Sequence, residues 1–149
     1  MPPTDVNSAI NQIVAVLRTV SGIENVPLNP PSVMSYTTFG LVYPSTGTFD
    51  ANPTGTKKGL HNIAIDILSR DMDKANVINK IKPFIDSVSL ALLRQISYDV
   101  SGNPGQRFGD TISTFEDVTY SFIPEADYGG VPVTGYHFSM NNTKLLTSL

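Results

Sequence analysis

The chain has 149 residues, a formal net charge of −3 at pH 7 and no cysteine. This length suits one domain around a single hydrophobic core, and the lack of cysteine excludes disulfides and thiolate metal sites. No block of basic residues indicates nucleic-acid binding. Only 15% of the residues are charged, so we expect a surface rich in Ser, Thr, Asn and Gly that suits contacts with other proteins.

No targeting or membrane-spanning segment is expected. The first residues lack the positively charged region and the apolar core of a signal peptide. No apolar run in the sequence is long enough to cross a bilayer. We therefore expect synthesis in the cytoplasm.

An amphipathic helix and a proline-rich connector are expected first. Apolar residues recur at spacings of three and four, namely Val6, Ile10, Ile13, Leu17 and Val20. Thr4 or Asp5 can cap this helix, and Gly22 ends it, because glycine tolerates the left-handed conformation that follows many helices. Residues 24–32 contain three prolines, which exclude a helix or an interior strand.

A strand and a long loop are expected next. The strand, at 39–44, has Phe39, Leu41 and Tyr43 on one face, and Pro44 ends it or marks it as an edge strand. Residues 45–56 show no periodicity and are too many for an ordinary hairpin loop. Such a loop is either a binding arm that orders on assembly or a tolerated insertion, and both alternatives stay open.

The strand expected at 57–70 organises the rest of the chain. Ile63, Ile65 and Ile67 alternate with small or polar residues that include Ala64 and Asp66. Strict alternation is typical of a strand with one buried face, and isoleucine suits that face.

The strongest helix signal follows this strand. Asp71 or Asp73 can cap the helix, and an apolar stripe then runs from residue 77 to residue 96. The stripe continues through Pro83, which removes one backbone hydrogen bond. We therefore expect a kink or a split at Pro83, with both halves packed on the same surface.

The C-terminal third is expected to form a hairpin. Residues 99–109 form a loop, a third strand covers 112–123, and Pro124 closes it. Residues 125–130 make the turn, a fourth strand covers 131–140, and 141–149 form a tail that contains three leucines.

These elements predict a single α+β domain. It has an antiparallel or mixed four-stranded sheet with two main helices on one face, in the order α-β-β-α-β-β, and a long loop between the first two strands. The other face is either wet or turned towards a partner, and it carries small and polar residues: Asn62, Ala64, Asp66, Thr119 and Ser121.

A search of the sequence for catalytic chemistry finds little. There is no phosphate-binding loop and no nucleophile elbow, and His61 and His137 each stand alone. Glu125 and Asp127 are paired carboxylates, but they lie beside two glycines, where acidic residues commonly make local hydrogen bonds. We expect no catalytic residue, cofactor or metal, which favours a structural or binding role over an enzyme.

Two stretches resemble a known family. Residues 57–67, KKGLHNIAIDI, followed by the helix at 73–85 with its Pro83-Phe84, resemble the middle of the tail-terminator proteins of long-tailed bacteriophages. Residues 128–138, YGGVPVTGYHF, resemble their closing hairpin, in which an aromatic-Gly-Gly turn leads into a strand with glycine and then an aromatic residue. The chain has Tyr128 where tryptophan is expected at least as often.

The resemblance implies a virion protein. Members of this family form a six-membered ring at the head-proximal end of the tail tube, where the ring stops tube polymerisation and offers a surface to the head connector. The implied partners are other copies of the chain, the tail tube protein and the head-tail connector or head-completion protein. Double-stranded DNA would only pass through the lumen of the ring, and no membrane is involved.

A ring needs two different complementary surfaces on each subunit, because its contacts are heterologous. We expect the loop at 45–59 to reach a neighbouring subunit or the tube. The candidate contact residues are Phe49, Asp50, Lys57, Lys58, Asp66, Glu125, Asp127 and Tyr128.

Two other interpretations stay open. One is a related neck, tail-completion or tail tube protein, which would share the small ring subunit. The other is a small ligand-binding or hydrolytic domain, which would need His61 or His137 to meet Asp66, Glu125 or Asp127 in a pocket.

Overall fold

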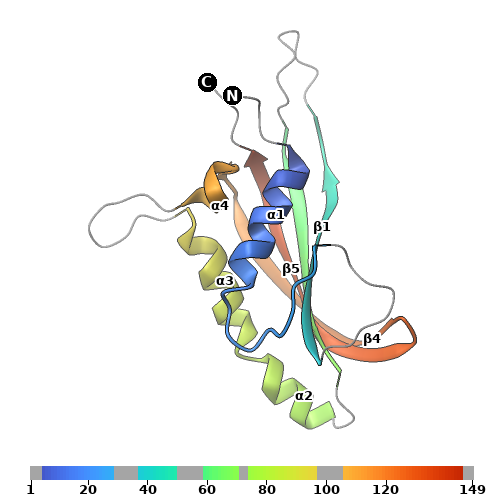
Figure 1. The fold of residues 1–149 in the computed structure, drawn as a ribbon. Coiled ribbons are helices and arrows are strands. Elements are labelled where there is room, and N and C mark those ends of the chain that lie inside the picture. The colour runs from blue at the N-terminus through green and yellow to red at the C-terminus, as the bar shows by residue number, and fades with distance from the viewer. Residues whose placement is uncertain (1–4, 29–36, 50–58, 71–73, 97–105, 146–149) are drawn as a thin grey trace, which may run out of the picture.

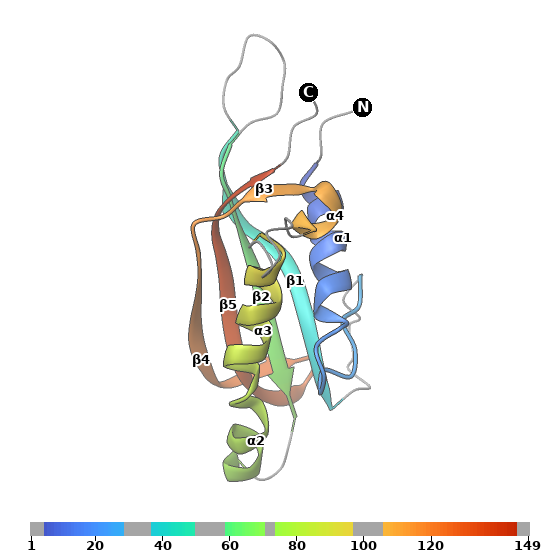
Figure 2. The ribbon, with the colours of Figure 1, turned by 90° about the vertical axis from the view of Figure 1, so that its left-hand side faces the viewer.

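The computed structural model describes residues 5–28, 37–49, 59–70, 74–96 and 106–145. These residues form one α+β domain with a curled antiparallel sheet, and the helices line one side of it (Figure 1; Figure 2). In chain order the elements are α1 (Val6–Leu17), β1 (Thr38–Gly47), β2 (His61–Ser69), α2 (Lys74–Ile81), α3 (Phe84–Arg94), α4 (Arg107–Asp110), β3 (Ile112–Thr114), β4 (Asp117–Tyr128) and β5 (Val131–Leu145).

The sheet is ordered β1-β2-β5, and both β3 and β4 pair with the far edge of β5. Every ladder between these strands is antiparallel, so the mixed alternative is wrong for the strands that the structure describes. A single parallel bridge joins Asn25, which lies outside these strands, to Phe39 of β1. The sheet has five strands rather than four, because the expected third strand is interrupted at Phe115 and forms β3 and β4.

The core lies between the helices and the two middle strands. Ile63, Ile65 and Ile67 of β2 are completely buried, as their alternation predicts. Tyr136 and Phe138 of β5 pair in register with Ile67 and Ile65 and extend the same apolar floor. The buried stripe of α1 packs on this floor, and so do the buried residues of α2 and α3.

The split at Pro83 is confirmed. Helix α2 ends at Ile81 and α3 begins at Phe84, and buried residues from both helices belong to the same core cluster. Because the apolar stripe continues across the break, losing one backbone hydrogen bond at Pro83 does not separate the two halves.

A second, smaller cluster lies on the opposite side of the sheet. The β4–β5 hairpin curls at one end of the sheet (Figure 1), and its residues pack on β1 and β2. The buried members are Phe39, Leu41, Leu68 and Val133. Gly135 allows the close approach of β5 to β2, because a Cβ at this position would lie 1.9 Å from the carbonyl oxygen of Ile67.

Both edge strands continue past a proline, so the edge-strand alternative for Pro44 is confirmed, whereas the prediction that Pro124 closes its strand is wrong. Strand β1 passes through Pro44 to Gly47, and β4 passes through Pro124 to Tyr128, each with a register shift at the proline. An edge strand tolerates proline because the missing N–H faces no partner strand. The expected loop therefore starts later than residue 45, and the expected turn at 125–130 shrinks to Gly129-Gly130.

The other boundaries also move. Strand β5 extends to Leu145, so residues 141–145 belong to the sheet rather than to a tail. Strand β2 begins at His61 rather than at residue 57. The expected loop at 99–109 ends in α4, a left-handed turn in which Arg107, Phe108, Gly109 and Asp110 all have φ between 50° and 62°. Burial of Phe108, whose N–H donates to Gln95 Oε1 at 3.1 Å, anchors this strained turn.

Replacing Ile65 by alanine tests whether β2 is the centre of the core. Ile65 is 0% exposed, so Ile65→Ala should lower the free energy of unfolding by about 2–5 kcal/mol in urea denaturation. The matched control is Leu90→Ala on α3, where the side chain is 48% exposed and the loss should stay below about 0.5 kcal/mol. Equal losses in the two variants would contradict this core.

Candidate interaction surfaces

The side of the sheet that faces away from the helices centres on Asp66. The carboxylate accepts a hydrogen bond from the Tyr43 hydroxyl at Oδ2 (2.8 Å), and His137 Nδ1 lies 2.5 Å from Oδ1. Asp66 stands opposite His137 in the β2–β5 register, so three neighbouring strands contribute one side chain each. The sequence named Asp66 as a contact residue, and the structure joins it to a histidine 71 positions away.

Burial, followed by the hydrogen bond to Asp66 and the negative charge of Asp66, raises the pKa of Tyr43 to about 12. Its hydroxyl therefore stays protonated and remains a donor across the physiological pH range. Since a carboxylate can only accept hydrogen bonds, the Tyr43–Asp66 contact has a fixed direction.

Asp66 and His137 form a carboxylate–imidazole pair like the one that activates the nucleophile in a catalytic triad. Ser121 of β4 lies opposite His137 in register, but the described residues show no hydrogen bond between Ser121 and His137. No group of three metal-ligating side chains occurs within the described ranges. A catalytic triad is therefore not assembled in this arrangement.

Other polar side chains on this side of the sheet bond to one another. Asn141 Nδ2 donates to Asp117 Oδ1 (2.8 Å) and to Thr119 Oγ1 (3.0 Å), and Ser139 Oγ donates to Asn141 Oδ1 (2.7 Å). These bonds follow the sheet surface rather than converge on one point. The arrangement is that of a polar face spread over several strands.

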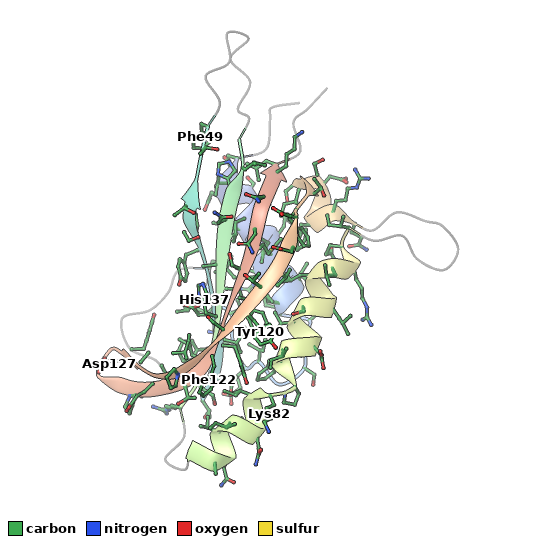
Figure 3. All side chains as sticks on the ribbon, turned by 180° about the vertical axis from the view of Figure 1, so that it is seen from behind. Phe49, Lys82, Tyr120, Phe122, Asp127 and His137 are labelled. Carbon is green, nitrogen blue, oxygen red and sulfur yellow. The ribbon has the colours of Figure 1, made fainter. Side chains whose placement is uncertain are left out.

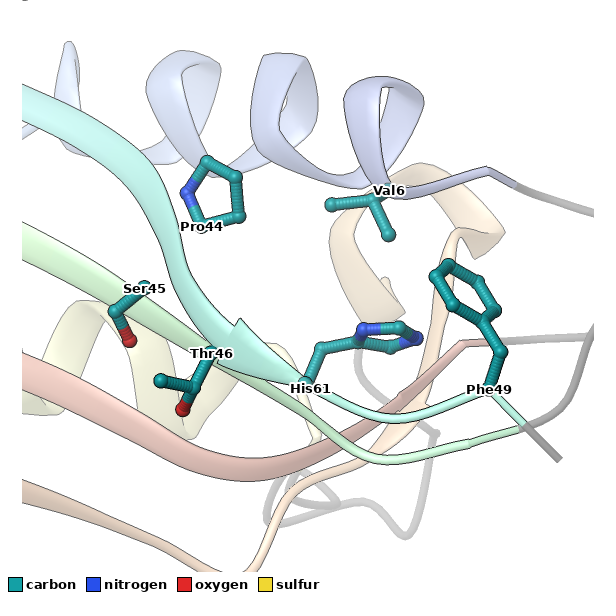
Figure 4. Close-up of a pocket in the computed structure, with 7 residues that line it drawn as sticks. Val6, Pro44, Ser45, Thr46, Phe49 and His61 are labelled. Atoms are coloured by element: carbon teal, nitrogen blue, oxygen red, sulfur yellow. The ribbon is translucent and has the colours of Figure 1, made fainter.

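A second candidate surface lies where β1 and β2 separate. Phe49 follows the end of β1 by two residues, is 63% exposed, and packs edge-on against His61 with ring centroids 4.9 Å apart. A cavity of about 440 Å³ opens here (Figure 4), lined by Val6, Pro44, Ser45, Thr46, Gly47, Phe49 and His61. The predicted contact residues Asp50, Lys57 and Lys58 fall outside the described residues.

His61 is 5% exposed, and this burial lowers the pKa of its imidazole. The neutral ring contacts Phe49 and forms part of the cavity wall. The sequence singled out His61 as a lone histidine and did not indicate that Phe49 would pack on it.

The two carboxylates predicted near the hairpin turn lie apart from both histidines. Glu125 and Asp127 are exposed on β4, and the structure pairs neither carboxylate with His61 or His137. Asp127 Oδ1 accepts a hydrogen bond from the Gly130 N–H at 2.8 Å, which is the local role expected of an acidic residue beside glycines. Tyr128 is half-buried, and its ring lies 5.4 Å from that of Phe39.

A third surface was not predicted from the sequence. Tyr120 and Phe122 of β4 are 56% and 42% exposed (Figure 3), and their rings contact Tyr136 at 6.0 and 5.5 Å. The alternating pattern placed both residues on one face but could not indicate that helices leave this part of β4 uncovered. The proline at 124 was the one sequence signal that this strand lies at an edge.

Comparison with models of known protein families finds no match to the chain, and comparison with curated proteins finds none either. Within the described ranges, no helix has both the length and the apolar character needed to cross a bilayer. The proposed function therefore rests on the surfaces of the domain.

Acidification is expected to destabilise the domain through His61. Burial lowers the folded pKa below the unfolded value of about 6.5, so the stability present above pH 6.5 is lost as the pH falls through the folded pKa. The free energy of unfolding, measured in urea at pH 7.5 and pH 5.5, should fall less in His61→Gln than in the unaltered protein. An unchanged difference between the two pH values in His61→Gln would contradict this role.

Proposed function

We propose that the chain is a structural subunit of a bacteriophage tail that closes into a ring at the head-proximal end of the tail tube. The ring ends tube polymerisation and joins the tail to the head connector. The observation that supports this proposal is a sheet with two open edges of different chemistry. Among the described strands, β4 pairs only with β5 and β1 pairs only with β2. Residues 24–25 bond to the outer edge of β1 between Thr38 and Gly40, so this edge is open beyond Gly40.

The two edges differ as a heterologous contact requires. Strand β1, TFGLVYPSTG, carries no charge, whereas β4, DVTYSFIPEADY, carries three acidic residues and no basic one. In a ring of identical subunits, one surface of each subunit meets a different surface of the next. Pro44 and Pro124 interrupt the two edges, which limits indiscriminate strand pairing.

The sequence resemblance supports the same function. The stretches that resemble tail terminators coincide with β2, with the split helix α2–α3 and with the hairpin that turns at Gly129-Gly130. A small domain with a sheet and helices on one side is the fold that the resemblance implies. A neck or tube protein would use the same kind of ring subunit and remains the nearest related function.

The loop at 45–59 is the proposed assembly arm. Its described base includes Phe49, the most exposed large apolar side chain of the described residues. An exposed aromatic ring at the base of a long polar loop suits an anchor for a neighbouring subunit or the tube. We therefore infer that the arm contacts one of these partners.

Deleting residues 48–54 tests the arm. The shortened chain should keep the circular dichroism spectrum and unfolding transition of the original, since the core lies elsewhere, but it should lose ring formation or attachment to tube ends in electron micrographs. Replacing the same seven residues with a Gly/Ser stretch of equal length removes the side chains while keeping the loop long enough to close. Unaltered rings and attachment in both variants would refute the arm.

A hydrolytic or ligand-binding domain is the second candidate function, and the contact between Asp66 and His137 favours it. His137→Ala and Asp66→Asn separate the two functions. If the chain is a hydrolase, both variants should lose at least about 100-fold in rate on ester substrates hydrolysed by the original protein. Normal assembly of both variants, with no activity to lose, would eliminate this candidate.

A further inference from the structure

We propose that the cavity between the start of α1, the end of β1 and the start of β2 binds a small neutral molecule that carries an aromatic ring and a hydroxyl group. The cavity measures about 440 Å³, which lies within the range of small-molecule sites. Its described walls come from Val6 of α1, from residues 44–47 of β1 with Phe49 beyond them, and from His61 of β2 (Figure 4). This inference goes beyond the proposed ring and does not depend on it.

The imidazole of His61 is the polar group that the cavity wall leaves without a partner. Its ring points towards Val6 of α1 (Figure 4), and no hydrogen bond joins it to another residue. Within the described ranges, no side-chain nitrogen or oxygen that is sealed from solvent lacks a hydrogen-bond partner. Both ring nitrogens are therefore accessible from the cavity that the ring lines, although His61 as a whole is only 5% exposed.

The other polar side chains around the cavity are already bonded elsewhere. Ser45 Oγ donates to the carbonyl of Asn62 at 2.9 Å, and Asn62 Nδ2 donates to Thr46 Oγ1 at 2.8 Å. Figure 4 shows the hydroxyl groups of Ser45 and Thr46 turned away from α1. The described lining therefore offers a ligand one side chain for hydrogen bonding, His61, within otherwise apolar walls.

The apolar part of the lining favours an aromatic ring. Val6 and Pro44 contribute aliphatic groups to the wall. Phe49 packs edge-on against His61 with ring centroids 4.9 Å apart, and it remains 63% exposed, so much of its ring is free to make a further contact. Aromatic rings pair in offset-stacked or edge-to-face arrangements, which a planar ligand can make with Phe49.

The imidazole decides the polar part of the ligand. Burial lowers the pKa of His61, so the ring is neutral at pH 7.5, and no charged side chain occurs in the described lining. A neutral imidazole has one N–H donor and one acceptor nitrogen, and a hydroxyl group can pair with either. A carboxylate would instead be buried without an opposite charge, which is costly. The chemistry of the wall thus selects a phenol over an aromatic acid.

Three probes that share a methylated benzene ring test this selection. p-Cresol adds a hydroxyl group to the ring, p-toluate adds a carboxylate, and toluene adds neither. In NMR titrations of the full chain at pH 7.5, p-cresol should shift the ring protons of His61 with a dissociation constant of about 1 mM, a typical value for so small a ligand. Toluene should bind about 10-fold more weakly, since it lacks the hydrogen bond, and p-toluate should cause no shift.

Two variants separate the polar contact from the apolar one. His61→Phe keeps a ring of similar size but removes both nitrogens, so p-cresol should bind about 10-fold more weakly and toluene as before. Phe49→Ala removes an aromatic wall, so both probes should bind more weakly. The matched control is Tyr120→Ala, which removes an aromatic side chain of similar exposure, 56%, on another strand and should leave both affinities unchanged. Amide shifts report binding to the variants, and thermal unfolding verifies that each one is folded.

The site is wrong if p-cresol leaves the ring protons of His61 unshifted up to about 20 mM. It is also wrong if folded His61→Phe still prefers p-cresol to toluene as strongly as the original protein does. If His61→Phe does not fold, Phe49→Ala decides, because unchanged affinities in that variant overturn the proposal. A similar loss in Tyr120→Ala would overturn it too, since the probes would then bind exposed aromatic rings in general.

Discussion

The antiparallel pairing of β2 with β5 decides the rest of this structure. It sets the isoleucines of β2 beside Tyr136 and Phe138 of β5, and the helices cover this combined floor. Side chains alternate along a strand, so burying Ile65 and Ile67 turns Asp66 to the opposite side. The same register places Asp66 opposite His137, where the two side chains meet. The hydrophobic core and the polar face are therefore two results of one pairing.

The sheet edges that this pairing leaves open are the basis of the proposed function. The two middle strands have partners on both sides, whereas β4 and the part of β1 beyond Gly40 are open among the described residues, and the exposed aromatic rings gather at these two edges. A lone domain gains nothing from exposing Tyr120 and Phe122, but a ring subunit needs two unlike surfaces that fit each other. The contact of Asp66 with His137 has a simpler structural explanation, because the hydroxyl of Tyr43 also binds the carboxylate and the three residues tie β1, β2 and β5 together.

Local patterns in the sequence predicted the parts of the fold that depend on local physics. The alternation around Ile65 and the break at Pro83 needed only periodicity and the chemistry of proline. The edge status that Pro44 indicates was one of the predicted alternatives. The boundary at Pro124 was missed because a proline ends an interior strand but is tolerated at an edge, and edge status depends on the whole sheet. The exposure of Tyr120 was missed for a related reason, since one sequence does not indicate how far the helices extend across the sheet. The contact of Asp66 with His137 joins residues 71 positions apart, and no spacing rule predicts it.

The mass of the purified protein in solution tests the central claim most directly. Light scattering should be recorded across a range of concentrations, with and without isolated tail tubes. A ring subunit predicts one closed species of fixed mass, in solution or only on tube ends, that does not grow with concentration. A monomer that ignores tubes would contradict the claim and favour a ligand-binding or hydrolytic domain, and polymers of increasing length would identify a tube protein instead.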